Sequence, residues 1–137
     1  MVKTAKEIMH KHTFVKGEAS IRDVAELMSR KKIGSVLVEV SKGFGMLSER
    51  DIVVKVIVEG KDPKTVKAKD IMSYPVVTIE ADADLYKVSS LFTNNNFRRL
   101  PVMEKGKVIG VLTTRDVAKQ FIPQFFKEAY HFQDFRF

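Results

Sequence analysis

The sequence predicts an α/β protein, of the α+β kind, in which two β-α-β-β-α repeats related by a pseudo-twofold axis pack into one module. Three observations support this fold class. Similar strings recur at an offset that drifts only from 63 to 65 residues. Each copy combines a helical spacing of apolar residues with apolar runs typical of buried strands. A chain of 137 residues can bury one shared core, whereas neither half has enough apolar residues to close a core alone.

The repetition starts near the N-terminus, where AKEIM at 5–9 returns as AKDIM at 68–72. The next matching pair is IRDVAELM at 21–28 and LYKVSSLF at 85–92. Both strings carry apolar residues at positions i, i+3, i+6 and i+7, which lie on one face of a helix. We therefore expect one amphipathic helix in each copy.

Strands follow these helices. SVLVEV at 35–40 and RLPVM at 99–103 predict buried strands, and EKGK at 104–107 predicts a tight turn into the next strand. Pro101 has no N–H to donate, so its strand either lies at a sheet edge or leaves one position of the ladder unpaired.

Glycines stand inside the last strand of each copy, at Gly45 and Gly110. A missing side chain within a strand indicates a bulge or the close approach of another segment. The strings ERDIVVKVIVEG at 49–60 and TRDVAKQF at 114–121 then predict a second helix in each copy, ending before Pro63 and Pro123.

The predicted domain organisation has three parts. Residues 1–66 form repeat 1 with its linker, residues 67–122 form repeat 2, and residues 123–137 form an aromatic tail. The tail contains six Phe or Tyr residues, which favour either a terminal helix over an exposed core edge or a contact between subunits.

Composition narrows the class of protein. Hydrophobic residues make up 45% and charged residues 30%, as in globular domains, and the formal charge of +7 favours anionic partners. The absence of cysteine excludes disulfides, thiolate catalysis and thiolate metal ligands. No signal peptide or membrane-spanning stretch is visible, so we expect a cytoplasmic protein without a membrane partner.

The strings SERD at 48–51 and TTRD at 113–116 allow two interpretations. A Ser or Thr followed three residues later by an acid is typical of a helix N-cap, which needs no ligand. The arginine before each acid is not explained by a cap. A hydroxyl, free amides and a guanidinium suit phosphate oxygens, and an acceptor-only carboxylate suits a ribose diol. From spacing alone, both interpretations stay open.

These strings, taken in order, resemble a stand-alone tandem pair of CBS domains, the modules named after cystathionine β-synthase. The resemblance covers residues 3–122 and rests on AKEIM and AKDIM, on RRLPVM at 98–103, and on GMLSERD and GVLTTRD. It implies a non-catalytic sensor that binds AMP, ADP or ATP in clefts between the paired repeats. The resemblance further implies a homodimer that regulates another, unidentified protein, with no cofactor and no metal.

The resemblance also assigns roles to individual residues. In the second repeat Asp116 holds the ribose, Thr113 and Arg115 hold the phosphate, and the strand at 76–78 with Phe97 lines the adenine. The predicted ligand-binding set is Asp116, Thr113, Arg115, Thr78, Val77, Phe97 and Arg98, with Asp51, Ser48, Arg50, Ile33 and the strand at 13–15 in the first repeat. Arg98 and Arg99 are equally well explained as solvated or ion-paired strand residues.

Two departures weaken the first-repeat site. Glu49 stands where Thr114 stands in the second copy, which places a carboxylate beside the expected phosphates. Leu37 replaces the family proline that Pro101 preserves. We therefore expect the second-repeat site to be the better one.

The sequence argues against an enzyme and leaves two other functions open. No HExxH, Ser-His-acid or Walker-type string occurs, and the two histidines at positions 10 and 12 are interpreted as surface residues, so an enzyme is not expected. Nucleic-acid binding remains an alternative because of the basic charge and the Lys-rich stretches. A protein-association scaffold with empty clefts is the second alternative.

Overall fold

The computed structural model describes residues 2–121, so the predictions for the aromatic tail at 123–137 lie outside the described residues. Its contacts divide the chain into two compact units, each of which is described by itself. The first-repeat unit comprises residues 12–76. The second-repeat unit combines residues 2–11 with residues 77–121.

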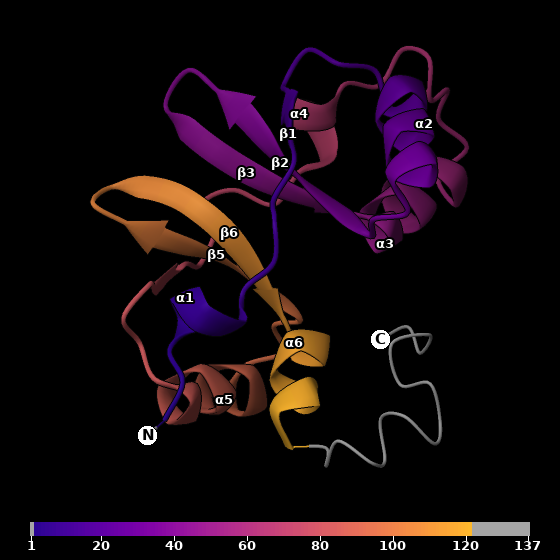
Figure 1. The fold of residues 1–137 in the computed structure, drawn as a ribbon. Helices are drawn as coiled ribbons and strands as arrows, with labels where there is room; N and C mark the ends of the chain where they lie inside the picture. Colours follow the sequence, from indigo (N-terminus) through magenta and orange to yellow (C-terminus); the bar gives the residue numbers. More distant parts are fainter. Residues whose placement is uncertain (1, 122–137) are drawn as a thin grey trace. The chain divides into compact units, whose positions relative to one another are not determined.

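The first-repeat unit contains a three-stranded sheet with the order β1-β2-β3. Strand β1 is parallel to β2, and β2 is antiparallel to β3. The helices α2, α3 and α4 and the π-helical turn η1 complete this unit (Figure 1). The bounds in chain order are β1(Phe14–Lys16), α2(Ile21–Lys31), β2(Ser35–Val40), β3(Gly43–Ser48), α3(Glu49–Ile52), η1(Val53–Ile57) and α4(Ala68–Ile71).

The second-repeat unit repeats this topology with the strand order β4-β5-β6. Strand β4 is parallel to β5, and β5 is antiparallel to β6. Its elements are α1(Ala5–Ile8), β4(Ile79–Glu80), α5(Leu85–Asn94), β5(Arg99–Glu104), β6(Lys107–Thr113), α6(Thr114–Ala118) and the 3₁₀ turn η2(Lys119–Phe121). Two β-α-β-β-α repeats with two three-stranded sheets confirm the predicted fold class.

The two AK-x-IM strings form short helices, α1 and α4, which the apolar periodicity did not predict. Each helix packs in the unit of the other repeat. The Ala5 N–H donates to the Ala83 carbonyl at 2.8 Å, and the Ala68 N–H donates to the Ala19 carbonyl at the same distance. Figure 1 shows α1, at the start of the chain, beside α5 and the β5–β6 hairpin. Each compact unit therefore contains the opening segment of the other sequence repeat.

Each unit has its own apolar core. The long helix of each unit begins at a side-chain cap, Ser20 for α2 and Asp84 for α5, and packs its apolar face on the sheet. Fully buried residues from the central and antiparallel strands complete each core, namely Val36, Val38 and Leu47 in one unit and Leu100, Val102 and Leu112 in the other.

The alternative that Pro101 marks an edge strand is wrong, because β5 is the central strand of its sheet. The equivalent residue, Leu37, donates its N–H to the Thr13 carbonyl at 2.8 Å. A proline cannot donate this bond, so the corresponding bond to the Val77 carbonyl cannot form. Strand β4 accordingly has two residues where β1 has three. Pro101 thus shortens the parallel ladder of its sheet without placing β5 at the edge.

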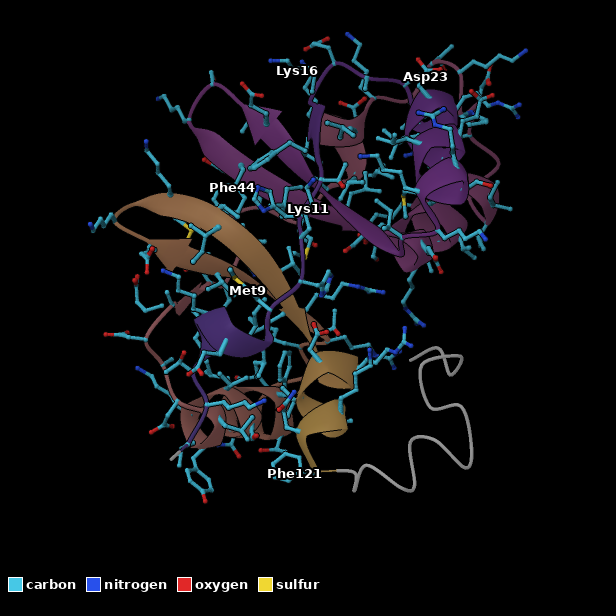
Figure 2. The ribbon with its side chains drawn as sticks, in the orientation of Figure 1. Met9, Lys11, Lys16, Asp23, Phe44 and Phe121 are labelled. Atoms are coloured by element: carbon cyan, nitrogen blue, oxygen red, sulfur yellow. The ribbon has the colours of Figure 1, made fainter. Side chains whose placement is uncertain are left out.

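The predicted turn at 104–107 is present, with Lys105 and Gly106 at φ 52° and 76°, as a two-residue hairpin turn requires. Gly45 and Gly110 allow a close approach, as expected. A Cβ at Gly110 would meet the Met9 sulfur and would lie 2.9 Å from the His10 carbonyl oxygen, and a Cβ at Gly45 would meet Met72 and the Ser73 carbonyl in the same way. Figure 2 shows Met9 beside β6.

Candidate functional site

The second-repeat site is built where β6 ends and α6 begins. Thr113 is the N-cap of α6, and its Oγ1 accepts the Asp116 N–H at 3.1 Å. In return, the Thr113 N–H and hydroxyl donate to Asp116 Oδ2 at 2.8 and 3.0 Å. This is a capping box. It fixes the carboxylate next to the strand end through Oδ2, and neither bond uses Oδ1.

The first-repeat site has the same local geometry. Ser48 caps α3, and its N–H and hydroxyl donate to Asp51 Oδ2 at 2.8 and 3.1 Å. The Asp51 N–H donates to Ser48 Oγ at 3.3 Å. The capping interpretation of both Ser/Thr-x-x-Asp strings is therefore confirmed. It does not decide whether the capped carboxylates also bind a ligand.

A second bond ties each helix start to the entry of the central strand. The Thr114 N–H donates to the Arg98 carbonyl at 3.1 Å, and the Glu49 N–H donates to the Gly34 carbonyl at 3.0 Å. Thr113 is also the register partner of Arg99 in the sheet. The structure thus brings the Arg98–Arg99 segment to the residues of the TTRD string.

The predicted adenine-contacting residues lie at the same end of the second-repeat sheet. Val77 and Thr78 directly precede β4, whose Ile79 is paired with Val102 of β5. Val77 is 45% exposed, Thr78 is half-buried, and Phe97 packs partly against the core. These residues are two strands away from Thr113, because β5 lies between β4 and β6. They line the end of the sheet at which β6 enters α6.

The corresponding residues of the first-repeat unit follow the same arrangement. Ile33 packs partly against the core before β2, and Phe14 of β1 is 40% exposed. The arginines of the two strings differ in exposure, because Arg50 is exposed whereas Arg115 is half-buried.

The two aspartates differ most in the basic side chains beside them. His10 Nδ1 lies 2.7 Å from Asp116 Oδ2. Asp51 Oδ1 instead lies 3.2 Å from Lys55 Nζ, one helical turn further along, and this ammonium also donates to the Ile71 carbonyl at 2.9 Å. A histidine contacts one acid, and a lysine contacts the other.

The pKa of Asp116 is lowered from its ordinary value. Burial is the largest single effect and raises the pKa of this carboxyl, but the hydrogen bond and charge of His10 and the two Thr113 donors together outweigh it. The side chain of Asp116 is 14% exposed, and it remains an anion at neutral pH.

His10 is the residue that sequence reasoning missed. Its side chain is 48% exposed, in keeping with a surface residue, but its ring is turned onto Asp116. The only signal in the sequence was a difference between the repeats, since His10 follows EIM where Ser73 follows DIM. That difference becomes informative only once α1 is known to pack in the second-repeat unit.

Among the described residues, no group of three or more His, Asp or Glu side chains could hold a metal ion. Within residues 2–121, every helix is too short or too polar to cross a bilayer.

Comparison with known proteins identifies the family. The sequence profile of the CBS domain matches residues 5–57 and 68–122, so the chain belongs to the CBS-domain family and carries a tandem pair of these domains. Each matched segment lies within one of the two sequence repeats. The chain is therefore a CBS pair.

Three similar proteins illustrate the family. An uncharacterised protein of Methanopyrus kandleri is 40% identical over 98 residues, which cover 69% of this chain and 50% of that protein. The chain therefore spans about half the length of this relative. The hexameric CBS-CP12 protein from bloom-forming cyanobacteria has a TM-score of 0.80 and 32% identity, over 91% of this chain and 74% of that one. A protein with CBS domains from Burkholderia ambifaria, assigned to signal transduction, has a TM-score of 0.79 and 26% identity, and 98% of each chain is covered.

Proposed function

We propose that this CBS pair is a non-catalytic sensor that binds an adenine nucleotide, AMP, ADP or ATP, and regulates another protein. The observation that carries the proposal is the geometry of Asp116. Its Oδ2 is held by Thr113, while Oδ1 takes no part in these bonds and can accept the hydroxyls of a ribose. The anionic form that such hydrogen bonds need is favoured by the lowered pKa of Asp116.

The surrounding residues supply groups for the rest of a nucleotide. Arg115 and Arg98 provide guanidinium donors of the kind that bind phosphoryl oxygens bidentately. The exposed Val77 and half-buried Phe97 offer apolar surface for a base. Since Pro101 cannot donate to the Val77 carbonyl, this oxygen is available to accept a hydrogen bond from the exocyclic amino group of adenine.

The second-repeat site is the stronger of the two. In the first-repeat unit, the exposed Glu49 is the first residue of α3 and adds a carboxylate where Thr114 has a hydroxyl. A like charge at a few ångströms costs about 1 kcal/mol or more against a bound phosphate when it is partly shielded from water. We therefore propose that Ser48, Arg50, Asp51 and Ile33 form a weaker second site.

The test is isothermal calorimetry and thermal unfolding with AMP, ADP, ATP and S-adenosylmethionine. Ligand at a hundred times its dissociation constant stabilises the folded protein by about 2.7 kcal/mol. Asp116→Asn keeps an oxygen that can cap α6 but removes the charge, and we expect it to weaken binding about tenfold or more. The matched Asp51→Asn variant is expected to bind nearly as tightly as the wild type.

The absence of a melting shift with all four ligands would overturn the proposal and favour the scaffold or nucleic-acid alternatives. Binding to nucleic acid would weaken steeply between low and moderate salt, whereas a nucleotide at a partly apolar site would lose far less affinity. Several lysines are already paired with acids, namely Lys67 and Lys69 with Glu18, Lys16 with Glu39 and Lys6 with Glu104. These pairs reduce the positive surface available to a phosphate backbone.

We further propose that the chain forms a homodimer through the helical turn after α3. Val53, Val54, Ile57 and Val58 are 52%, 44%, 63% and 73% exposed. They share one side of the turn, whereas the intervening Val56 is fully buried in the core. A contiguous apolar face of this kind is typical of a surface that contacts another protein.

A further inference from the structure

The contact between His10 and Asp116 joins two segments 106 residues apart in the sequence. The main chain of His10 is fixed on β6, since it exchanges two hydrogen bonds with Val111, each 3.0 Å long. The backbone of His10 is therefore fixed close to the TTRD string, and the contact of Nδ1 with Asp116 Oδ2 brings the ring onto the acid.

The first-repeat unit lacks this arrangement. Ser73 occupies the equivalent place and exchanges main-chain hydrogen bonds with Met46 at 2.8 and 3.0 Å, but a serine carries no charge. The cation on Asp51 is Lys55, and the residue at the equivalent position of the second repeat is the uncharged Gln120. In the first-repeat unit the basic partner of the acid follows the SERD string along the same helix. In the second-repeat unit it comes from the segment after α1.

We propose that His10 is a further residue of the nucleotide site and that its protonation sets how tightly the second-repeat site holds a phosphorylated nucleoside. This inference rests on the proposed function. Imidazole is the side chain whose charge ordinarily changes between pH 5 and 8, whereas an ammonium stays charged throughout that range. The Asp116 site therefore has an imidazole beside its carboxylate, and the Asp51 site has an ammonium.

The direction of the effect follows from the charge. With His10 protonated, the His10–Asp116 pair is neutral. With His10 uncharged, the pair carries one negative charge that repels a phosphate. The other charged side chains on the elements that meet at His10 are Lys6, Glu7, Arg99, Glu104, Lys107, Arg115 and Lys119, with Lys11 adjacent in the chain. Nucleotide binding is therefore tighter at pH 5.5 than at pH 8.

The experiment compares AMP affinity by calorimetry at pH 5.5 and pH 8 for the wild type, His10→Gln, His10→Ser and His12→Gln. His10→Gln keeps a hydrogen-bond donor without a titratable charge, and His10→Ser introduces the residue found at position 73. His12→Gln is the matched control. The phosphate of AMP itself titrates near pH 6, so the result is read as the difference between each variant and the wild type, in which the ligand's titration cancels.

In the wild type and in His12→Gln, we expect the affinity for AMP to rise about three- to tenfold more between pH 8 and pH 5.5 than in either His10 variant. One additional unit charge close to a bound phosphate predicts an effect of this size. AMP binding with the same pH dependence in all four proteins would overturn the role of His10 and leave the proposed function intact. Failure of the wild type to bind any of AMP, ADP and ATP at either pH would overturn both.

Discussion

The two Ser/Thr-x-x-Asp sites of this protein share a backbone and differ in the charges placed around it. In both units, a strand ends at a hydroxyl residue that caps a helix and holds an aspartate through Oδ2. The neighbours of Asp116 are the hydroxyl residue Thr114 and the imidazole of His10. The neighbours of Asp51 at the corresponding places are Glu49 and the ammonium of Lys55. Duplication has preserved the geometry of the cap while the surrounding side chains diverged. The difference between the two units therefore lies in the side chains around the cap and not in the cap itself.

The largest expected effect concerns the helices after the two strings. The first-repeat helix presents exposed valines and an isoleucine, whereas its counterpart continues with the half-buried Ala118 and Lys119. Ile57→Asp places a charge on the proposed dimer face and should weaken self-association about a hundredfold or more, since an unpaired charge at an interface costs several kcal/mol. Sedimentation equilibrium measures this change.

Tyr86→Asp is the control for that measurement, because Tyr86 is 70% exposed on α5 and lies outside the proposed face. A wild type that sediments as a monomer at all concentrations, or an Ile57→Asp variant with unchanged mass, would contradict the dimer proposal.

The next effect concerns a feature that both units share, namely the glycine in the last strand of each sheet. Gly45→Ala and Gly110→Ala each place a methyl group against a methionine sulfur and a main-chain carbonyl. Because a carbonyl in a paired segment cannot move freely, we expect each substitution to lower the free energy of unfolding by about 1 to 3 kcal/mol. Urea denaturation measures the loss.

Met9→Ala, combined with Gly110→Ala, should recover part of that stability, since it removes the sulfur but not the His10 carbonyl. Changes below about 0.5 kcal/mol in both single variants would show that α1 and α4 do not seat against these glycines as described.

The smallest expected effect is the pH dependence of the stability that Asp116 contributes. Asp116 has a lowered pKa in the folded state, so its contribution to stability is present above the pKa of the unfolded chain. This contribution disappears as the pH falls through the lowered value. At neutral pH we expect Asp116→Asn to cost on the order of 1 kcal/mol, because an amide oxygen still accepts the Thr113 bonds.

Urea titrations of the wild type and Asp116→Asn between pH 6 and pH 2.5 measure this difference. The two curves should approach each other as the solution becomes acidic. A constant separation throughout would mean that the ionised form of Asp116 contributes nothing to folding.

Local features of the fold could be predicted from the sequence because their causes are local. The repeats, the two caps at Ser48 and Thr113, the turn at Lys105–Gly106 and the need for Gly110 each follow from a few neighbouring residues. Pro101 shows the limit of such reasoning. A proline could mark an edge strand or a gap in a central one, and only the pairing with β4 decided between them.

The role of His10 could not be predicted for a related reason. Aligning the repeats assigns His10 to the first repeat, far from Asp116, and the two residues meet only because α1 packs in the second-repeat unit. Exchange of this kind depends on main-chain bonds such as those from Ala5 to Ala83 and from His10 to Val111, which leave no local trace in the sequence.

The same exchange constrains how the chain can be made. During synthesis residues 2–11 leave the ribosome well before the strand on which they settle, because that strand ends at Thr113. Until that strand has emerged, the segment with α1 lacks its packing partner, and Ile8 and Met9 are exposed to solvent or to chaperones. A ribosome-bound chain stalled before residue 107 would hold a complete first-repeat unit and an unfinished second-repeat unit, in which α1 has no strand β6 to pack on.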